Sequence, residues 1–152
     1  MSRAALLLVI PVMLACTKSD APPADTTIAA SPESAPLAIP VNYAGTWTVT
    51  VMPEGKDTVL LSYPLVATND KTGWKLTLPG REPMEPRIIS LDSDSVVLDN
   101  GPYPSVLRKD VSVSTHSTMH MEGDRLVGTT IARYNTRGAD SVVTLRTQAT
   151  RQ

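Results

Sequence analysis

Apolar and polar side chains alternate with a period of two through most of the chain after position 40. Within residues 45–51, Trp47, Val49 and Val51 fall on one face and three threonines fall on the other. Such alternation is typical of a half-buried β-strand, because successive side chains of a strand point to opposite faces of the sheet. Further runs repeat the pattern and predict strands at 59–67, 74–78, 87–91, 95–98, 111–122, 126–134 and 141–147.

Turn-forming residues separate these runs. Asn, Asp, Gly and Pro cluster at 69–73, 92–94, 99–102, 122–124 and 135–140, and these residue types favour tight turns. No segment carries a convincing helical period. The sequence therefore predicts an all-β fold, an antiparallel up-and-down barrel of about eight strands. A sandwich is the alternative, but closure into a barrel leaves no exposed strand edge and is therefore favoured.

The first sixteen residues have a different character. A positively charged start with Arg3 precedes an apolar run from Ala4 to Leu14. This run has the length of a signal-peptide core and is short of the about 20 residues that cross a bilayer. Ala15 and then Cys16, the only cysteine of the chain, follow directly. An ordinary signal peptide with a chance cysteine is the simpler alternative.

The sequence Met13-Leu14-Ala15-Cys16 resembles the lipobox of bacterial lipoproteins. Met13 stands where that family usually has Leu. The resemblance implies that residues 1–15 are a signal peptide and that a diacylglycerol on the sulfur of Cys16 anchors the protein in a membrane. Thr17 stands where an Asp often directs retention in the inner membrane, so the resemblance implies the outer membrane, with the domain facing the periplasm or the cell surface.

Residues 16–40 form the second part of the predicted organisation. After Cys16 they are rich in Pro, Ala, Ser and Thr and contain no aromatic residue, so they cannot bury enough apolar surface to offset the entropy of ordering. We expect a disordered linker, either a plain stalk or a recognition segment for a partner. Residues 41–152 form the third part, the predicted β-barrel domain.

The motif Gly45-Thr46-Trp47 resembles the Gly-x-Trp signature on the first strand of lipocalin-like barrels. This resemblance implies that Trp47 closes one end of the barrel and that an Arg from the last strand packs across its ring. We expect Arg146 in that role, with Arg133 as the second choice. The domain is short for a lipocalin and has none of the disulfides that many of them carry.

Few residues suggest metal chemistry. His116 and His120 share one face of a predicted strand but lie about 13 Å apart along it, so we expect a polar outer face there, extending to Glu122. Acidic residues at 92–94 and Asp99 lack the Gly and Glu of a calcium loop. A polar loop at 79–86 is expected over one barrel end, as a simple connection or as a place for binding specificity.

Charge and motif content narrow the function classes. The 14 basic and 15 acidic residues nearly balance, which gives neither the basic footprint of a nucleic-acid binder nor a polybasic membrane patch. No hydrolase, phosphate-loop or dinucleotide motif is present. The sequence predicts a monomeric, non-catalytic domain without cofactor or metal, which binds a small apolar ligand inside the barrel or an envelope protein at its loops. A structural lipoprotein without ligand is the alternative, and a hydrolase is a weaker one.

Overall fold

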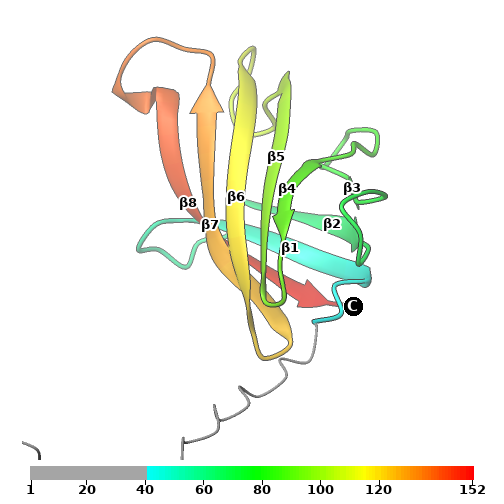
Figure 1. Cartoon of the computed structure of the whole chain (residues 1–152). Coiled ribbons are helices and arrows are strands. Elements are labelled where there is room, and N and C mark those ends of the chain that lie inside the picture. Colours follow the sequence, from blue (N-terminus) through cyan, green and yellow to red (C-terminus); the bar gives the residue numbers. More distant parts are fainter. Residues whose placement is uncertain (1–40) are drawn as a thin grey trace, which may run out of the picture. The chain divides into compact units, whose positions relative to one another are not determined.

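One antiparallel sheet forms the domain in the computed structural model, which describes residues 41–152 (Figure 1). The eight strands are ordered β3-β2-β1-β8-β7-β6-β5-β4. Within the described residues, the helical structure is a single 3₁₀ turn, η1 (Ala139–Ser141). The strands are β1 (Gly45–Pro53), β2 (Leu61–Ala67), β3 (Lys75–Leu76), β4 (Arg87–Leu91), β5 (Ser95–Pro104), β6 (Ser112–Glu122), β7 (Arg125–Tyr134) and β8 (Val142–Arg151).

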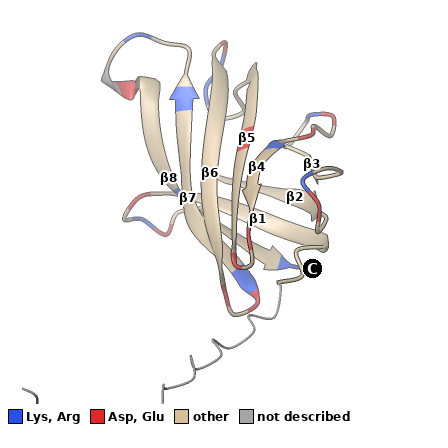
Figure 2. Ribbon diagram, in the orientation of Figure 1, with Lys and Arg blue, Asp and Glu red and all other residues tan. Residues whose placement is uncertain are grey.

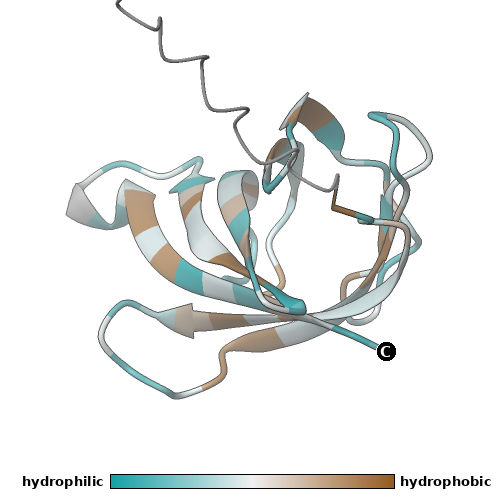
Figure 3. Ribbon diagram, turned by 60° about the horizontal axis from the view of Figure 1, so that its bottom comes forward, coloured by the Kyte–Doolittle hydropathy of each residue, from teal (hydrophilic) through white to brown (hydrophobic). Residues whose placement is uncertain are grey.

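Pairing of β1 with β8 curls the sheet into a half-barrel (Figure 3). Its two edge strands, β3 and β4, are not paired with each other. Leu76 of β3 forms an isolated bridge with Met84 of the β3–β4 loop, through two backbone hydrogen bonds of 2.9 Å each. Lys71 Nζ also donates to the Ile89 carbonyl at 2.9 Å, which protects the β4 edge. The predicted all-β, up-and-down arrangement of about eight antiparallel strands is confirmed. The sheet is a half-barrel whose β3 and β4 edges are not paired with each other.

The period of two places side chains as predicted. On β1, Trp47, Val49 and Val51 are buried, while the threonines between them are partly exposed. On β6, Val113, Ser117 and Met119 are buried. The two histidines of β6 belong to the opposite, outer face, because they occupy the alternate positions.

The segment 99–102 is not a turn, contrary to the sequence prediction. Strand β5 runs through it to Pro104, paired with β4 at Asp99 and with β6 on its other side. Ladder hydrogen bonds on both sides outweigh the local preference of Asn, Gly and Pro for a turn, which is instead expressed as a register shift between Asn100 and Tyr103. The turn itself comes later, where Ser105 N donates to the Val111 carbonyl at 2.8 Å.

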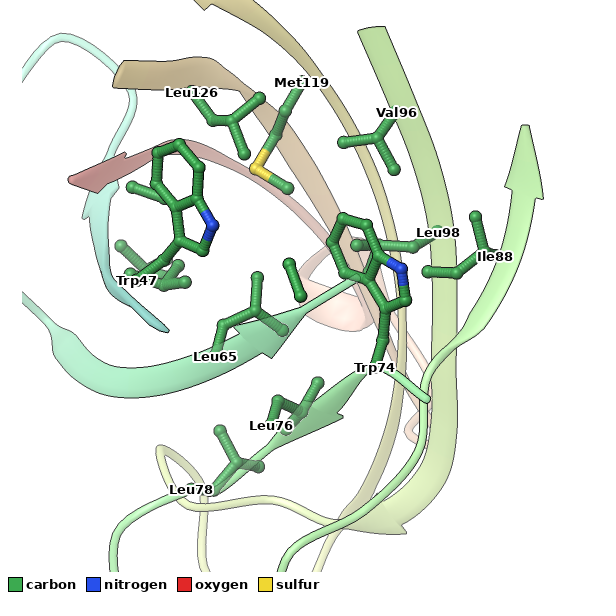
Figure 4. Close-up of a cluster of buried hydrophobic side chains, with 14 of the residues drawn as sticks. Trp47, Leu65, Trp74, Leu76, Leu78, Ile88, Val96, Leu98, Met119 and Leu126 are labelled. Carbon is green, nitrogen blue, oxygen red and sulfur yellow. The ribbon is translucent and has the colours of Figure 1, made fainter. Parts of the chain in front are cut away.

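Two tryptophans contribute the largest side chains of the buried hydrophobic core (Figure 4). Trp47 and Trp74 are 0% and 1% exposed and pack among aliphatic residues of β5, β6 and β7. Trp74 Nε1 donates to the Asp70 carbonyl at 2.7 Å, and its ring lies 6.3 Å from that of Tyr43. Both indoles therefore combine a large apolar burial with a satisfied N–H group.

The predictions for the signal peptide at 1–15, for Cys16 and for the linker at 16–40 lie outside the described residues and remain predictions. Within residues 41–152, no helix combines the length and the apolar character required for crossing a bilayer.

Candidate functional site

Trp47 on β1 is fully buried beneath an arginine of the last strand. Its Nε1 donates to the Tyr43 carbonyl at 2.9 Å. The guanidinium carbon of Arg151 lies 4.3 Å from the centre of its ring, in cation–π geometry. Trp47 and Arg151 are cross-strand partners in the β1–β8 ladder, so the strand register itself brings them together.

Gly45 is required by the same arrangement. A Cβ at this position would lie 2.8 Å from Nη1 of Arg151, and the backbone φ of +139° is one that other residues rarely adopt. Because Gly45 has no side chain, the guanidinium of Arg151 reaches over the backbone and donates to the carbonyls of Ala44 and Asn42. The Gly-x-Trp motif and the last strand therefore form one hydrogen-bonded end cap.

The prediction that Arg146 packs on Trp47 is wrong. Arg146 lies opposite Met52 in the ladder and pairs with Asp57 at the β1–β2 turn. It occupies the alternate, outward-facing position of β8, because Leu145, Thr147 and Ala149 are the buried ones. The second choice, Arg133, is on the outer face of β7 and opposite Ser114, so it does not stack on Trp47 either.

A small internal pocket lies on the buried face of the curled sheet and is lined largely by core residues. Its volume is about 50 Å³. No charged side chain lines it. Its walls come mainly from β1, β2, β5, β6, β7 and β8, and aliphatic residues such as Val51, Leu98, Val113, Ala132 and Leu145 dominate them.

Neutral hydroxyl groups provide the polar part of this internal pocket. Ser117 and Thr130 hydroxyls are 2.8 Å apart, and the Thr130 and Thr147 hydroxyls are 2.6 Å apart, in a buried chain across three strands. Burial raises the pKa of Tyr63 and of Tyr103, and the phenol of Tyr103 adds to the effect on Tyr63. Both tyrosines therefore stay uncharged at neutral pH, and the pocket offers hydrogen bonds without an acid or a base.

The β5–β6 loop covers this pocket. Val106 and Leu107 contribute to its lining, and the Ser105 hydroxyl accepts from the backbone N–H groups of Leu107 and Arg108. The Arg108 guanidinium lies 4.0 Å above the ring of Tyr134, and its Nη1 donates to the Asp140 carbonyl at 2.8 Å. One arginine thus ties the covering loop to β7 and to the β7–β8 connection.

The histidines face away from the pocket, on the outer side of β6. Nδ1 of His116 lies 2.7 Å from Oδ1 of Asp99, and Oδ2 of the same carboxylate accepts from Arg87 at 2.7 Å. Hydrogen bonds from His116 and then from Arg87 lower the pKa of Asp99. His120 instead lies 3.1 Å from Glu122. Among the described residues, no three His, Cys, Asp or Glu side chains are grouped as metal ligands.

The remaining predicted segments have clear positions. Residues 92–94 form the β4–β5 turn, in which Asp92 N donates to the Ser95 carbonyl at 2.8 Å. The loop at 79–86 connects β3 to β4, and Arg81 donates from Nη2 to the Pro104 carbonyl at 3.1 Å. This contact ties the loop to the end of β5, beside the cover of the internal pocket.

No protein-family model, curated protein or solved structure matches this chain.

Sequence reasoning missed Arg108 and Arg151. The alternation of β8 gives the signal for Arg151, since Leu145, Thr147, Ala149 and Arg151 lie two residues apart and share one face. Arg108 has no comparable signal, because it lies in an irregular loop and its contact with Tyr134 depends on the tertiary fold.

Proposed function

We propose that this protein is a lipid-anchored envelope protein whose β-domain binds an apolar group without catalysing a reaction. The anchor is the acylated Cys16, inferred from the lipobox-like sequence before it. A protein held by two or three acyl chains stays on a membrane, because each buried methylene contributes about 0.8 kcal/mol.

The observation that supports binding most directly is the uncharged, mainly aliphatic pocket beneath the β5–β6 loop. Its volume of about 50 Å³ is far below the roughly 300–1,000 Å³ of typical small-molecule sites. The group that fits is therefore short, such as the end of an alkyl chain or one apolar side chain of an envelope protein. A larger ligand requires displacement of the loop that contains Leu107.

A structural lipoprotein without ligand is the second candidate. The side chains of Trp47, Trp74, Met119 and Leu126 lie in one buried cluster and are each no more than 2% exposed. A filled interior favours a purely structural domain, because ligand carriers depend on a continuous cavity.

Filling the internal pocket separates the two candidates. Ala132 is buried in its wall on β7, so Ala132→Val places two methyl groups inside it. Binding of hexanol, a short uncharged alkyl probe, is followed through the methyl NMR signals of the full chain. Thr129→Val is the matched control, because Thr129 is exposed on the other face of the same strand.

The binding function predicts saturable shifts of the Leu145 and Val51 methyl signals in the wild type and in Thr129→Val. Affinity should fall about tenfold or more in Ala132→Val, because the added groups occupy the site. Absence of saturable shifts in the wild type, together with a higher melting temperature of Ala132→Val, would instead support the structural candidate.

A further inference from the structure

A second hollow lies on the outer face of the sheet, away from the internal pocket. It is a groove of about 640 Å³ over β4, β5, β6 and β7. Side chains of Glu85, Arg87, Asp99, Ser114, His116 and Arg133 line it. Because Arg87, Asp99 and His116 face outward on neighbouring strands, this outer groove is independent of the proposed apolar binding.

The register shift in β5 shapes the outer groove. Asn100 pairs with Thr115 and Tyr103 pairs with Val113, so Gly101 and Pro102 together oppose Ser114 alone. A Cβ at Gly101 would lie 2.7 Å from the Val113 carbonyl oxygen, so only glycine permits the backbones to approach this closely. Bulges of this kind occur preferentially beside functional sites, where they redirect neighbouring side chains.

Asp99 organises one wall of the outer groove. Its two carboxylate oxygens are occupied by His116 and Arg87, each at 2.7 Å. An imidazole that donates from Nδ1 to a carboxylate leaves its Nε2 for another partner. Asp99 therefore fixes the orientation of the His116 ring and is not itself available to a cationic ligand.

Arg133 supplies the other wall. It is exposed and lies directly opposite Ser114 in the β6–β7 ladder, diagonal to His116. Diagonal cross-strand neighbours stand about 7–8 Å apart, which leaves room for one oxyanion between them. Within residues 41–152, the ion pairs involve Arg87, His116, His120 and Arg146 but not Arg133.

We propose that the outer groove binds an oxyanion, the carboxylate or phosphate group of a small ligand, between Arg133 and His116. The planar guanidinium of Arg133 matches such a group with two parallel hydrogen bonds. The Ser114 hydroxyl adds a further donor. Nε2 of His116 adds another in the cationic ring, in which both nitrogens carry hydrogen and Nδ1 still donates to Asp99. Charged residues are otherwise concentrated in loops and at strand ends (Figure 2).

Net attraction by the whole outer groove is small, because Glu85 and Asp99 balance Arg87 and Arg133 in formal charge. Affinity must therefore come from direct contact with Arg133 rather than from a long-range field. Replacement of Arg133 should therefore weaken oxyanion binding, and replacement of a distant arginine should not.

The two histidines allow a direct test in the full chain. Inorganic phosphate and, separately, succinate are titrated at constant pH and constant ionic strength while the imidazole NMR signals are recorded. His120 is an internal reference, because it lies on the same strand but does not line the outer groove. Arg133→Gln is compared with Arg125→Gln, which removes the same charge from the other end of β7.

The proposal predicts that at least one of the two anions shifts the His116 signals saturably while those of His120 stay in place. Arg133→Gln should weaken this binding about tenfold or more, and Arg125→Gln should leave it unchanged. The anion that binds with the higher affinity identifies the ligand group as phosphate or carboxylate. The proposal is overturned if neither anion gives saturation, if both histidines shift together, or if the two arginine variants, shown by circular dichroism to be folded, behave alike.

Discussion

A single arginine connects the two ends of the folded chain at the end cap. Arg151 is the penultimate residue, yet it contacts the carbonyls of Asn42 and Ala44 and covers the ring of Trp47. The lipocalin-like resemblance implied an arginine from the last strand there, and the sequence analysis assigned this role to Arg146. It selected the wrong one because the apolar alternation was followed only to Thr147, and Arg146 is out of phase with the buried face.

Replacing Arg151 with Ala should destabilise the domain and change the emission of Trp47. The loss of the cation–π contact and two hydrogen bonds should cost about 1–3 kcal/mol. Arg146→Ala removes an exposed ion pair and should cost less than about 1 kcal/mol. Thermal unfolding and tryptophan fluorescence measure both effects. Equal destabilisation, or a red shift of the emission only in Arg146→Ala, would contradict the assignment.

Asp99 should contribute stability that depends on pH. Hydrogen bonds from His116 and Arg87 lower its pKa in the folded state. Its contribution is therefore complete above the unfolded-state pKa of about 3.9 and is lost as the pH falls through the lower folded-state value. The effect should be no more than about 1 kcal/mol, because the partners Arg87 and His116 are solvent-exposed and water screens their interaction with Asp99.

Urea unfolding of the wild type and Asp99→Asn at several pH values measures this contribution. The wild type should be the more stable at pH values well above 4, and the difference should shrink as the solution becomes more acidic. A difference that grows with acidity would show that Asp99 is not held ionised by its two partners. Asp124→Asn is the charge control, because Asp124 lies in the exposed β6–β7 turn.

At the scale of elements, most strands follow from the period of two, whereas their ends do not. Strand β4 has the predicted bounds 87–91, but β5 continues through a segment with strong turn residues. Strand β3 keeps only two residues, since it sits at the edge of the sheet and pairs only with β2 and the isolated bridge. Local preference decides where a strand can form, and pairing with neighbours decides how far it extends.

Gly128 marks a point where two strands approach too closely for any side chain. It lies inside β7, opposite Met119, and a Cβ there would lie 2.0 Å from the Thr118 carbonyl oxygen. Gly128→Ala should therefore cost about 3 kcal/mol or more, because the backbone of β6 must move.

Gly123→Ala is the matched control in the neighbouring β6–β7 turn. Its φ of +64° disfavours Ala, but a Cβ there meets no atom within 4 Å, so we expect a cost of about 1–2 kcal/mol. Chemical denaturation of both variants compares the two free energies of unfolding. A Gly128→Ala variant that is no less stable than Gly123→Ala would contradict the close approach of β6 and β7.

At the scale of the whole molecule, the meander order was predictable and the size of the interior was not. Successive strands of a meander pair with each other, so the sequence led directly to an up-and-down sheet. The pocket volume instead depends on how side chains from seven strands and two loops fit together. The outer groove was equally inaccessible, because it arises from a register shift at residues that locally favour a turn.

The central claim is that the protein is anchored in a membrane, and it depends on lipidation of the sulfur atom of Cys16. The most direct test is the intact mass of the mature protein, extracted with mild detergent from its native envelope. We predict a chain that begins at Cys16 and carries the additional mass of a diacylglyceryl group, with or without a further acyl chain. A mature chain that begins after residue 16, without added lipid mass, would contradict the account.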